Sequence, residues 1–306
     1  MKLLLAKWLG LGLVVWPLLA GAAGTNWMAA VPGDRLLSQL SIPGTHDAGA
    51  RHEPFPGTAK CQELSLSDQL AAGVRFLDIR CRHVKDAFVI HHGSVDQHLS
   101  FDEVLQAVFG FLKAHPSECV IMSIKEEYDA SGDTRSFEKT FATYVAKNPG
   151  QWYLGAKLPQ LDQVRGRIVL FRRFSAQTGP LGIDASVWPD NRSFNVGEIL
   201  RVQDNYEVSD NAVKWRQIEG LLDEAKAGKP DTLFVNFASG YQSTIGIPNL
   251  VKVANDINPR LAAYMQAHPQ GRYGVILMDF AMAARCKPIY DSNFPDLGKP
   301  AGTANQ

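Results

Sequence analysis

Residues 40–49 read LSIPGTHDAG and place a titratable pair, His46 and Asp47, directly after a short apolar run. The run at 40–42 is typical of a strand, and Pro43-Gly44 ends it abruptly. A strand that stops at a tight turn with titratable side chains is how α/β enzymes present reactive groups at the carboxyl edge of a sheet. The alternative is an ordinary turn in which both side chains bond only to the backbone.

Other apolar segments also end in polar or ionisable residues. The eight sets of segment-end residues are His46 and Asp47; Asp78 and Arg80; His91 and His92; Lys125, Glu126 and Glu127; Arg172 and Arg173; Asp204; Ser239; and Asp279. On parallel strands these ends would converge on one rim, where burial is costly unless the groups pair with each other or with a ligand. A salt-bridged structural rim is the alternative, and an active site is the favoured interpretation.

The residue types at this rim indicate a chemistry. Two histidines, His46 and one of His91 and His92, suit a general base and a general acid near neutral pH. The other ionisable groups are the carboxylates Asp47, Asp78 and Asp279, which can orient the histidines, and the cations Arg80, Lys125 and Arg173. An arginine fork is a natural phosphate ligand. Together they predict phosphodiester cleavage by transfer to a neighbouring hydroxyl, without a covalent enzyme intermediate.

The segments that carry these residues alternate between strand and helix patterns. We expect strands at 40–42, 75–80, 88–91, 119–125, 167–173, 200–203, 232–237 and 273–278, and helices at 66–74, 101–114, 137–146, 211–227 and 250–268, the last broken near Pro259. This predicts an α/β fold, an irregular (β/α)8 TIM-type barrel in a single domain. Between 80 and 88 the chain is too short for a crossover helix, so these strands join irregularly or pair antiparallel.

Residues 1–24 have the pattern of a secretory signal peptide. Lys2 and Lys7 precede an apolar run at 8–19, and Ala20-Gly21-Ala22 resembles a cleavage site. The run is broken by Pro17 and is too short for a good membrane span. We therefore expect a secreted protein in which residues 25–306 form the barrel domain. Without the two lysines its formal charge is about −2, and no basic stripe suggests a nucleic-acid partner.

The four cysteines are Cys61, Cys81, Cys119 and Cys286. Export makes disulfides chemically possible, and four cysteines allow three full pairings. We expect Cys61 and Cys81 to be joined, because both flank the segment that leads into Asp78; that loop would contribute about 3 kcal/mol. Buried free thiols are the alternative. No spacing fits a zinc site, so we expect neither a metal nor a cofactor.

Five motifs resemble those of the bacterial phosphatidylinositol-specific phospholipases C. They are IPGTHD at 42–47, FLDIR at 76–80, HHG at 91–93, SIK at 123–125 and VQDNY at 202–206, and the match runs in order from Trp27 to Phe280. The resemblance implies an irregular barrel that cleaves phosphatidylinositol in membranes to diacylglycerol and inositol 1,2-cyclic phosphate. It makes glycosyl-phosphatidylinositol anchors a second candidate substrate, and we expect a monomer.

The resemblance also implies roles for individual residues. His46 would be the general base that takes the inositol 2-hydroxyl proton, held by Asp279. His92 would be the general acid that protonates the diacylglycerol oxygen, with Asp47 behind it. The other implied site residues are Arg80 at the phosphate, Asp78 as its support, and Lys125, Arg173, Asp204 and Tyr206 at the inositol hydroxyls, with Ser239 as a weaker match. His91 would face away and be structural.

Arg80 follows Asp78 by two residues, which places its guanidinium on the same side of the strand as that carboxylate. A fixed cation there makes a calcium ion unnecessary, so we expect a metal-free lyase. One rival is a metal-dependent glycerophosphodiester phosphodiesterase, which would open with His-Arg-Gly rather than His-Asp-Ala. The other is a secreted inositide-binding protein without catalysis. The cysteines and a loop at 179–191 are expected to lie outside the site.

The loop at 239–248 reads SGYQSTIGIP and carries Tyr241, Ile245 and Ile247 where a solvated loop would carry charge. It follows a strand end, as does a second loop with Phe55, so both should stand on the catalytic rim. These side chains either fold inward to cap the barrel or form an apolar tip that enters the membrane interface. We expect the membrane-interface role for Tyr241, Ile245 and Ile247.

Overall fold

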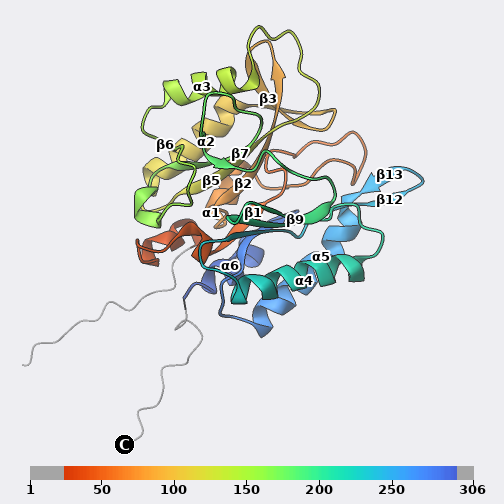
Figure 1. Ribbon diagram of the computed structural model, residues 1–306. Helices are drawn as coiled ribbons and strands as arrows, with labels where there is room; N and C mark the ends of the chain where they lie inside the picture. Colours follow the sequence, from red (N-terminus) through yellow and green to blue (C-terminus); the bar gives the residue numbers. More distant parts are fainter. Residues whose placement is uncertain (1–23, 295–306) are drawn as a thin grey trace, which may run out of the picture.

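The computed structural model describes residues 24–294, so the expected signal peptide lies outside the described residues except for Gly24. A curled β-sheet forms the centre, and helices pack around it (Figure 1). Seven neighbouring strands run parallel, in the order β7 (Ile168–Arg173), β5 (Val120–Glu126), β2 (Phe76–Val84), β1 (Ser41–Thr45), β14 (Gly274–Met278), β11 (Leu233–Phe237) and β10 (Leu200–Asp204). This confirms the predicted irregular barrel.

Short strands extend the sheet at both ends. β6 (Trp152–Tyr153) and β8 (Ile183–Asp184) pair in parallel with the two halves of β7, and β9 (Arg192–Val196) pairs antiparallel with β10. The hydrogen-bonded path through the sheet ends at β6 and β9, so the barrel is open between them. β1, β11 and β14 are buried along their whole length, as expected of parallel strands that are covered on both faces.

The expected strand at 88–91 is not part of the parallel barrel. It is β3 (Ala87–His92), which pairs antiparallel with β2 and with β4 (Val95–Ser100). The two residues between β2 and β3, Lys85 and Asp86, both have positive φ, at 50° and 61°. That conformation makes a two-residue hairpin turn, which sends the chain straight back along β2.

The helices are α1 (Leu66–Ala71), α2 (Phe101–Ala114), α3 (Phe137–Lys147), α4 (Asn211–Ala227), α5 (Leu250–Ala267) and α6 (Ala283–Asp291), with short 3-10 helices at Gly24–Ala30, Leu37–Gln39 and Leu161–Gln163. α2 starts at a capping box between Ser100 and Glu103. The expected break near Pro259 is wrong, because α5 continues through it. Ile257 and Leu261, on either side of Pro259, are buried in the core, and their packing keeps the helix continuous although proline has no backbone N–H to donate.

The expected disulfide is also wrong, because all four cysteines are free and buried. Cys81 lies on β2 in the main hydrophobic core, whereas Cys61 packs with Ala50 and Leu250 in a separate small cluster. Side chains alternate along a strand, so Cys81 points to the opposite face of β2 from Arg80.

α4 and α5 lie side by side, and a hairpin of β12 (Gln242–Thr244) and β13 (Ile247–Asn249) projects from the molecule beside them (Figure 1). In residues 24–294, no helix has both the length and the apolar character of a membrane span.

Candidate active site

His46 and Asp47 lie in the turn that follows β1. The backbone N–H of His46 donates to the carbonyl of Met278 at 3.2 Å, and that of Ala48 donates to the carbonyl of Asp78 at 2.8 Å. Asp47 has a φ of 40°, a left-handed conformation that aspartate tolerates better than most residues. The turn is therefore tied to the ends of β14 and β2, which fixes the directions of both side chains.

His46 forms the first histidine–carboxylate pair, with Asp279 after β14. The two side chains meet at 2.8 Å between Nδ1 and Oδ1, and Asp279 is buried. Burial would lower the pKa of His46, but the charge of Asp279 prevails and raises it above the ordinary value of 6.5. Since Nδ1 faces a carboxylate, the proton of the neutral ring belongs on Nδ1. Nε2 then carries the lone pair that a base needs, and the guanidinium of Arg80 meets it at 2.8 Å.

Gln62 holds both members of this pair in place. Its Nε2 donates to the carbonyls of His46 and Met278, both at 2.8 Å, and its Oε1 accepts from the N–H of Ala281 at 3.1 Å. Gln62 is fully buried. It therefore links the loops after β1 and β14 that carry His46 and Asp279.

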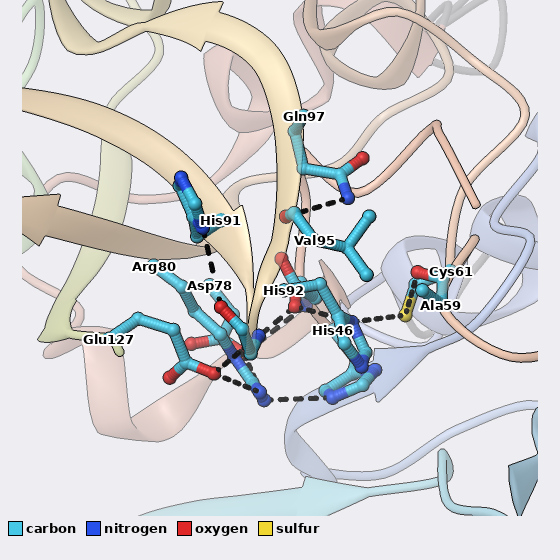
Figure 2. Close-up of polar contacts among 12 residues, drawn as sticks. His46, Ala59, Cys61, Asp78, Arg80, His91, His92, Val95, Gln97 and Glu127 are labelled. Atoms are coloured by element: carbon cyan, nitrogen blue, oxygen red, sulfur yellow. Dashed lines mark hydrogen bonds and ion pairs between the residues drawn. The ribbon is translucent and has the colours of Figure 1, made fainter. Parts of the chain in front are cut away.

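His92, at the end of β3, forms the second pair, with Asp47. Its Nδ1 lies 2.8 Å from Asp47 Oδ2, and its side chain is about a quarter exposed. The rings of His46 and His92 are edge to face, with their centroids 6.4 Å apart (Figure 2). Two histidines, each backed by a buried carboxylate, therefore face the same space from different strands.

Arg80 lies between the two pairs. Its guanidinium is 3.2 Å from Asp78 Oδ2, 3.6 Å from Asp47 Oδ2 and 3.8 Å from Glu127 Oε1. Its Nη2 also donates to Nε2 of His46 at 2.8 Å (Figure 2). Burial opposes the charge of Arg80, but these carboxylates hold its pKa well above the ordinary range. Arg80 is thus a fixed positive charge beside the prospective base.

Asp78 forms an ion pair with Arg80 and holds its guanidinium in place. It also lies 3.6 Å from Arg173 and accepts from the backbone N–H of Asp47 at 3.2 Å. Burial would raise the pKa of Asp78, yet Arg80 and Arg173 hold it well below its usual range, so the carboxylate stays charged. Asp78 therefore supports the cation rather than taking part in proton transfer.

The remaining wall is built from β5, β7, β10 and the loops behind them. Lys125 Nζ meets Glu127 Oε2 at 2.6 Å, and the guanidinium of Arg173 stacks 3.7 Å from the ring of Trp188. The indole N–H of Trp188 donates to Asp204 at 2.8 Å. In the same wall, the hydroxyl of Tyr206 donates to Asp190 at 2.6 Å.

These side chains enclose a cavity of about 1100 Å³ that is open to solvent. Its lining includes the expected residues His46, Arg80, His92, Lys125, Arg173, Asp204, Tyr206 and Tyr241. The expected Asp47, Asp78 and Asp279 lie behind this lining and contact it through the ion pairs described above. Charged and aromatic groups on one wall and two histidines on the other fit a polyhydroxylated phosphate ester.

Two expected site residues lie elsewhere than predicted. Ser239 is buried and does not line the cavity, because it precedes the turn at Gly240 that reaches the rim. Tyr241 is half-buried and its hydroxyl donates to Glu207 at 3.2 Å, so it belongs to the cavity wall rather than to an apolar tip. His91 is buried with its ring stacked on Tyr128, which agrees with the structural role predicted for it.

Sequence reasoning missed several contributors. Trp188 and Asp190 come from the loop at 179–191, which was expected to lie outside the site but lines the cavity. Glu127 was named as a strand-end residue without a role, although its spacing of two from Lys125 places both on one side of the chain. Cys61 was also expected outside the site, but its Sγ lies 3.5 Å from His92 Nδ1. No local pattern signals Trp188 or Cys61.

The β12–β13 hairpin carries its apolar residues outward. Ile245 is 97% exposed and Ile247 61% exposed, and Phe55 in the loop after β1 is 71% exposed. The inward-folded alternative is therefore excluded for these three side chains. In residues 24–294, the other exposed large apolar residues are Tyr128, Val187 and Met282 in loops and Val213 in the first turn of α4. Ile245, Ile247 and Phe55 thus present exposed apolar surface in segments that follow the ends of β11 and β1.

Comparisons with known proteins point to one family. The family model described as "Phosphatidylinositol-specific phospholipase C, X domain" matches residues 41–174. A "1-phosphatidylinositol phosphodiesterase" of Staphylococcus aureus (strain Newman) is 33% identical over 84% of this chain and 88% of its own. A protein of the same name from Listeria monocytogenes serovar 1/2a is 28% identical over 88% of this chain and 84% of its own.

Solved structures match over nearly the whole described chain. A structure of the Staphylococcus aureus phosphatidylinositol-specific phospholipase C, from work on modulation of its membrane binding, superposes with a TM-score of 0.81 at 31% identity. That match covers 89% of this chain and 98% of the other. The Listeria monocytogenes enzyme gives a TM-score of 0.75 at 26% identity, over 88% and 98% of the two chains.

Proposed function

Because this chain belongs to the phosphatidylinositol-specific phospholipase C family and cleaves phosphatidylinositol, we propose that it does so by general acid/base catalysis without a metal ion. The observation that carries the proposal is the pair of buried carboxylates, each 2.8 Å from a histidine, on either side of one guanidinium. A base, an acid and a fixed cation are the groups that an internal displacement at phosphorus requires.

In the proposed reaction, Arg80 Nη2 exchanges its contact with Nε2 of His46 for the phosphate, and Nε2 then takes the proton of the inositol 2-hydroxyl. The freed oxygen attacks phosphorus, the bond from phosphorus to the diacylglycerol oxygen breaks, and His92 gives that oxygen its proton. The products are inositol 1,2-cyclic phosphate and diacylglycerol. Asp279 stabilises the imidazolium that forms at His46, and Asp47 keeps Nδ1 of His92 paired so that Nε2 can carry the transferred proton.

Arg80 supplies the positive charge for the phosphate. It is shared among Asp47, Asp78 and Glu127, which hold its position before substrate enters. Such preorganisation is most effective in a partly buried site, where solvent cannot screen the charge. These contacts support catalysis without a metal and disfavour the metal-dependent glycerophosphodiester phosphodiesterase.

We assign Lys125, Arg173, Asp204 and Tyr206 to binding of the inositol hydroxyls. Each lines the cavity, and donors and acceptors are mixed, as a ring of hydroxyl groups requires. The cavity is larger than an inositol ring needs, so we extend the proposal to glycosyl-phosphatidylinositol anchors.

Phosphorus NMR of the products from phosphatidylinositol tests the reaction. A cyclic phosphate signal is expected. Release of glycerol phosphate would instead favour the phosphodiesterase alternative, and absence of turnover with retained inositide binding would favour the non-catalytic one.

We further propose that the rim docks on the membrane through Ile245 and Ile247. Burying one isoleucine contributes about 1.5–3 kcal/mol, so two can change membrane affinity by tens-fold or more. The similar Staphylococcus aureus enzyme has been studied for its membrane binding. On phosphatidylinositol vesicles, the double variant Ile245→Ser and Ile247→Ser should bind more weakly yet keep its turnover of a water-soluble inositol phosphodiester.

The matched control is Ile245→Leu with Ile247→Leu, which keeps the apolar area and should keep vesicle binding. An equal loss of turnover on both substrates in the serine variant would show that the hairpin supports the fold instead. We also propose that residues 1–24 direct secretion and that the mature enzyme is a monomer. The N-terminal sequence and the mass of the exported protein test both.

A further inference from the structure

We propose that Cys61, His92 and Asp47 form an inhibitory binding site for a thiophilic divalent cation, best matched by Zn²⁺. The three residues offer a sulfur, an imidazole nitrogen and a carboxylate oxygen, which is a zinc donor set. They come from the loop before α1, the end of β3 and the turn after β1, so no spacing in the sequence reveals them. The inhibitory effect rests on the function proposed above, whereas metal binding does not.

The donor atoms are already close together. Cys61 Sγ lies 3.5 Å from Nδ1 of His92 (Figure 2). The same Nδ1 lies 2.8 Å from Oδ2 of Asp47. All three donor atoms lie within 4.8 Å of one another. In a tetrahedral site with Zn–S near 2.3 Å and Zn–N near 2.0 Å, sulfur and nitrogen are about 3.5 Å apart. An ion therefore fits with small side-chain shifts.

The surroundings of Asp47 give a second, independent reason to expect a cation at this site. The residue is fully buried, and neither of its carboxylate oxygens makes a hydrogen bond of acceptable geometry with any residue in 24–294. Its contacts are the ion pairs with His92 at 2.8 Å and with Arg80 at 3.6 Å. A buried carboxylate with unused acceptor sites is unfavourable, and a cation would relieve that cost.

The charges around the thiol also favour a cation. Cys61 lies between both histidine–carboxylate pairs, since His46 and Asp279 form a second group of donor atoms within 4.8 Å of the same sulfur. The nearby fixed cation, Arg80, is already shared with Asp78 and Glu127. When Zn²⁺ binds, a zinc–sulfur bond forms, the S–H bond breaks and the proton leaves to solvent. No oxidant or reductant is needed.

His92 connects the proposed metal site to the cavity and explains why a bound ion would inhibit the enzyme. It lines the cavity and its side chain is about a quarter exposed, whereas Cys61 and Asp47 are fully buried, so the imidazole is the side of the site that faces solvent. A metal on Nδ1 occupies the nitrogen that Asp47 otherwise holds. The ring can then no longer be the imidazolium that protonates the leaving oxygen, so binding and turnover exclude each other.

The experiment compares wild type with Cys61→Ala and with the control Cys286→Ala, which removes another buried thiol from α6. Zn²⁺ should inhibit wild type and the control, and EDTA should restore both. Cys61→Ala should need at least about 10-fold more Zn²⁺ for the same inhibition, since even an outer-shell partner is worth that much. Equal inhibition of all three proteins would overturn the proposal.

Co²⁺ gives a readout that does not depend on activity. A thiolate-to-cobalt charge-transfer band should appear with wild type and Cys286→Ala and be missing with Cys61→Ala. The absence of the band in wild type, or its persistence in Cys61→Ala, would refute the site. If Cys61→Ala has low basal activity, or if the chain fails to cleave phosphatidylinositol, this spectrum still shows whether Cys61 binds the metal.

Discussion

Replacing Asp279 with asparagine removes the charge 2.8 Å from Nδ1 of His46 while nearly keeping the side-chain shape. Burial lowers the pKa of His46 and the charge of Asp279 raises it, with the net direction upward. Without that charge, burial prevails and the pKa of His46 falls. The asparagine amide can also donate to Nδ1, which would move the ring proton to Nε2 and remove the lone pair that acts as base.

The expected loss of activity in Asp279→Asn can be bounded from the distance between Asp279 and His46. Two unit charges 2.8 Å apart attract by roughly 6 kcal/mol at an effective dielectric constant of 20, which is a ceiling for what Asp279 contributes to a charged His46. Each factor of ten in rate corresponds to about 1.4 kcal/mol, so the ceiling is near 10⁴-fold. We expect kcat/KM to fall by about 10²–10⁴, the usual range for a positioned base.

The assay is the pH profile of kcat/KM on a water-soluble inositol phosphodiester. His46 must be neutral to accept a proton, so wild-type activity is lost as pH falls through its raised pKa, above 6.5. In Asp279→Asn the plateau should drop and the acid limb should move to lower pH. Asp96→Asn, in the exposed pair with His98, is the matched control and should change neither. An acid limb that stays in place in Asp279→Asn would refute our assignment of the base.

Three further outcomes are expected. His92→Ala should lower the rate by about 10²–10⁴. His91→Ala should mainly lower thermal stability, because its ring stacks on Tyr128. An inactive His91 variant together with an active His92 variant would show that His91 is the acid. Arg80→Lys should be badly impaired in the same assay, because an ammonium lacks the planar guanidinium that can contact phosphate and Asp78 at once. Near-wild-type rates would contradict this. Activity should survive EDTA, and a loss that calcium restores would contradict the metal-free mechanism.

The barrel could be predicted because its evidence is local. Apolar runs such as 119–125 and 273–278 are continuous, and they became β5 and β14 with nearly the same bounds. The errors arose where neighbours override local preference. Pro259 normally ends a helix, but buried residues on both sides keep α5 whole. Antiparallel pairing after residue 80 was one of two expected alternatives, and the turn at 85–86 that decides for it has no glycine to signal its positive φ values.

The site could be predicted only where its residues end strands. His46, Arg80, Lys125 and Arg173 were found this way because parallel strands share a rim. The partners within each pair depend on contacts between distant segments, such as His46 with a carboxylate 233 residues away, and came from the family resemblance. Trp188 lies in a loop without periodicity, so its place beneath Arg173 needed the structure.

The irregularity of the barrel coincides with the part of the chain that makes the site work. A crossover helix after β2 would have carried the chain out to the helix layer. The turn at Lys85-Asp86 instead returns it along β2, with Ile90 paired to Cys81, so that His92, two residues on, comes back to the level of the rim. There it meets Asp47, and Arg80 on the neighbouring strand lies 3.6 Å from the same carboxylate. The hairpin that breaks the βα repeat is therefore what brings the acid, its carboxylate and the phosphate-binding cation together.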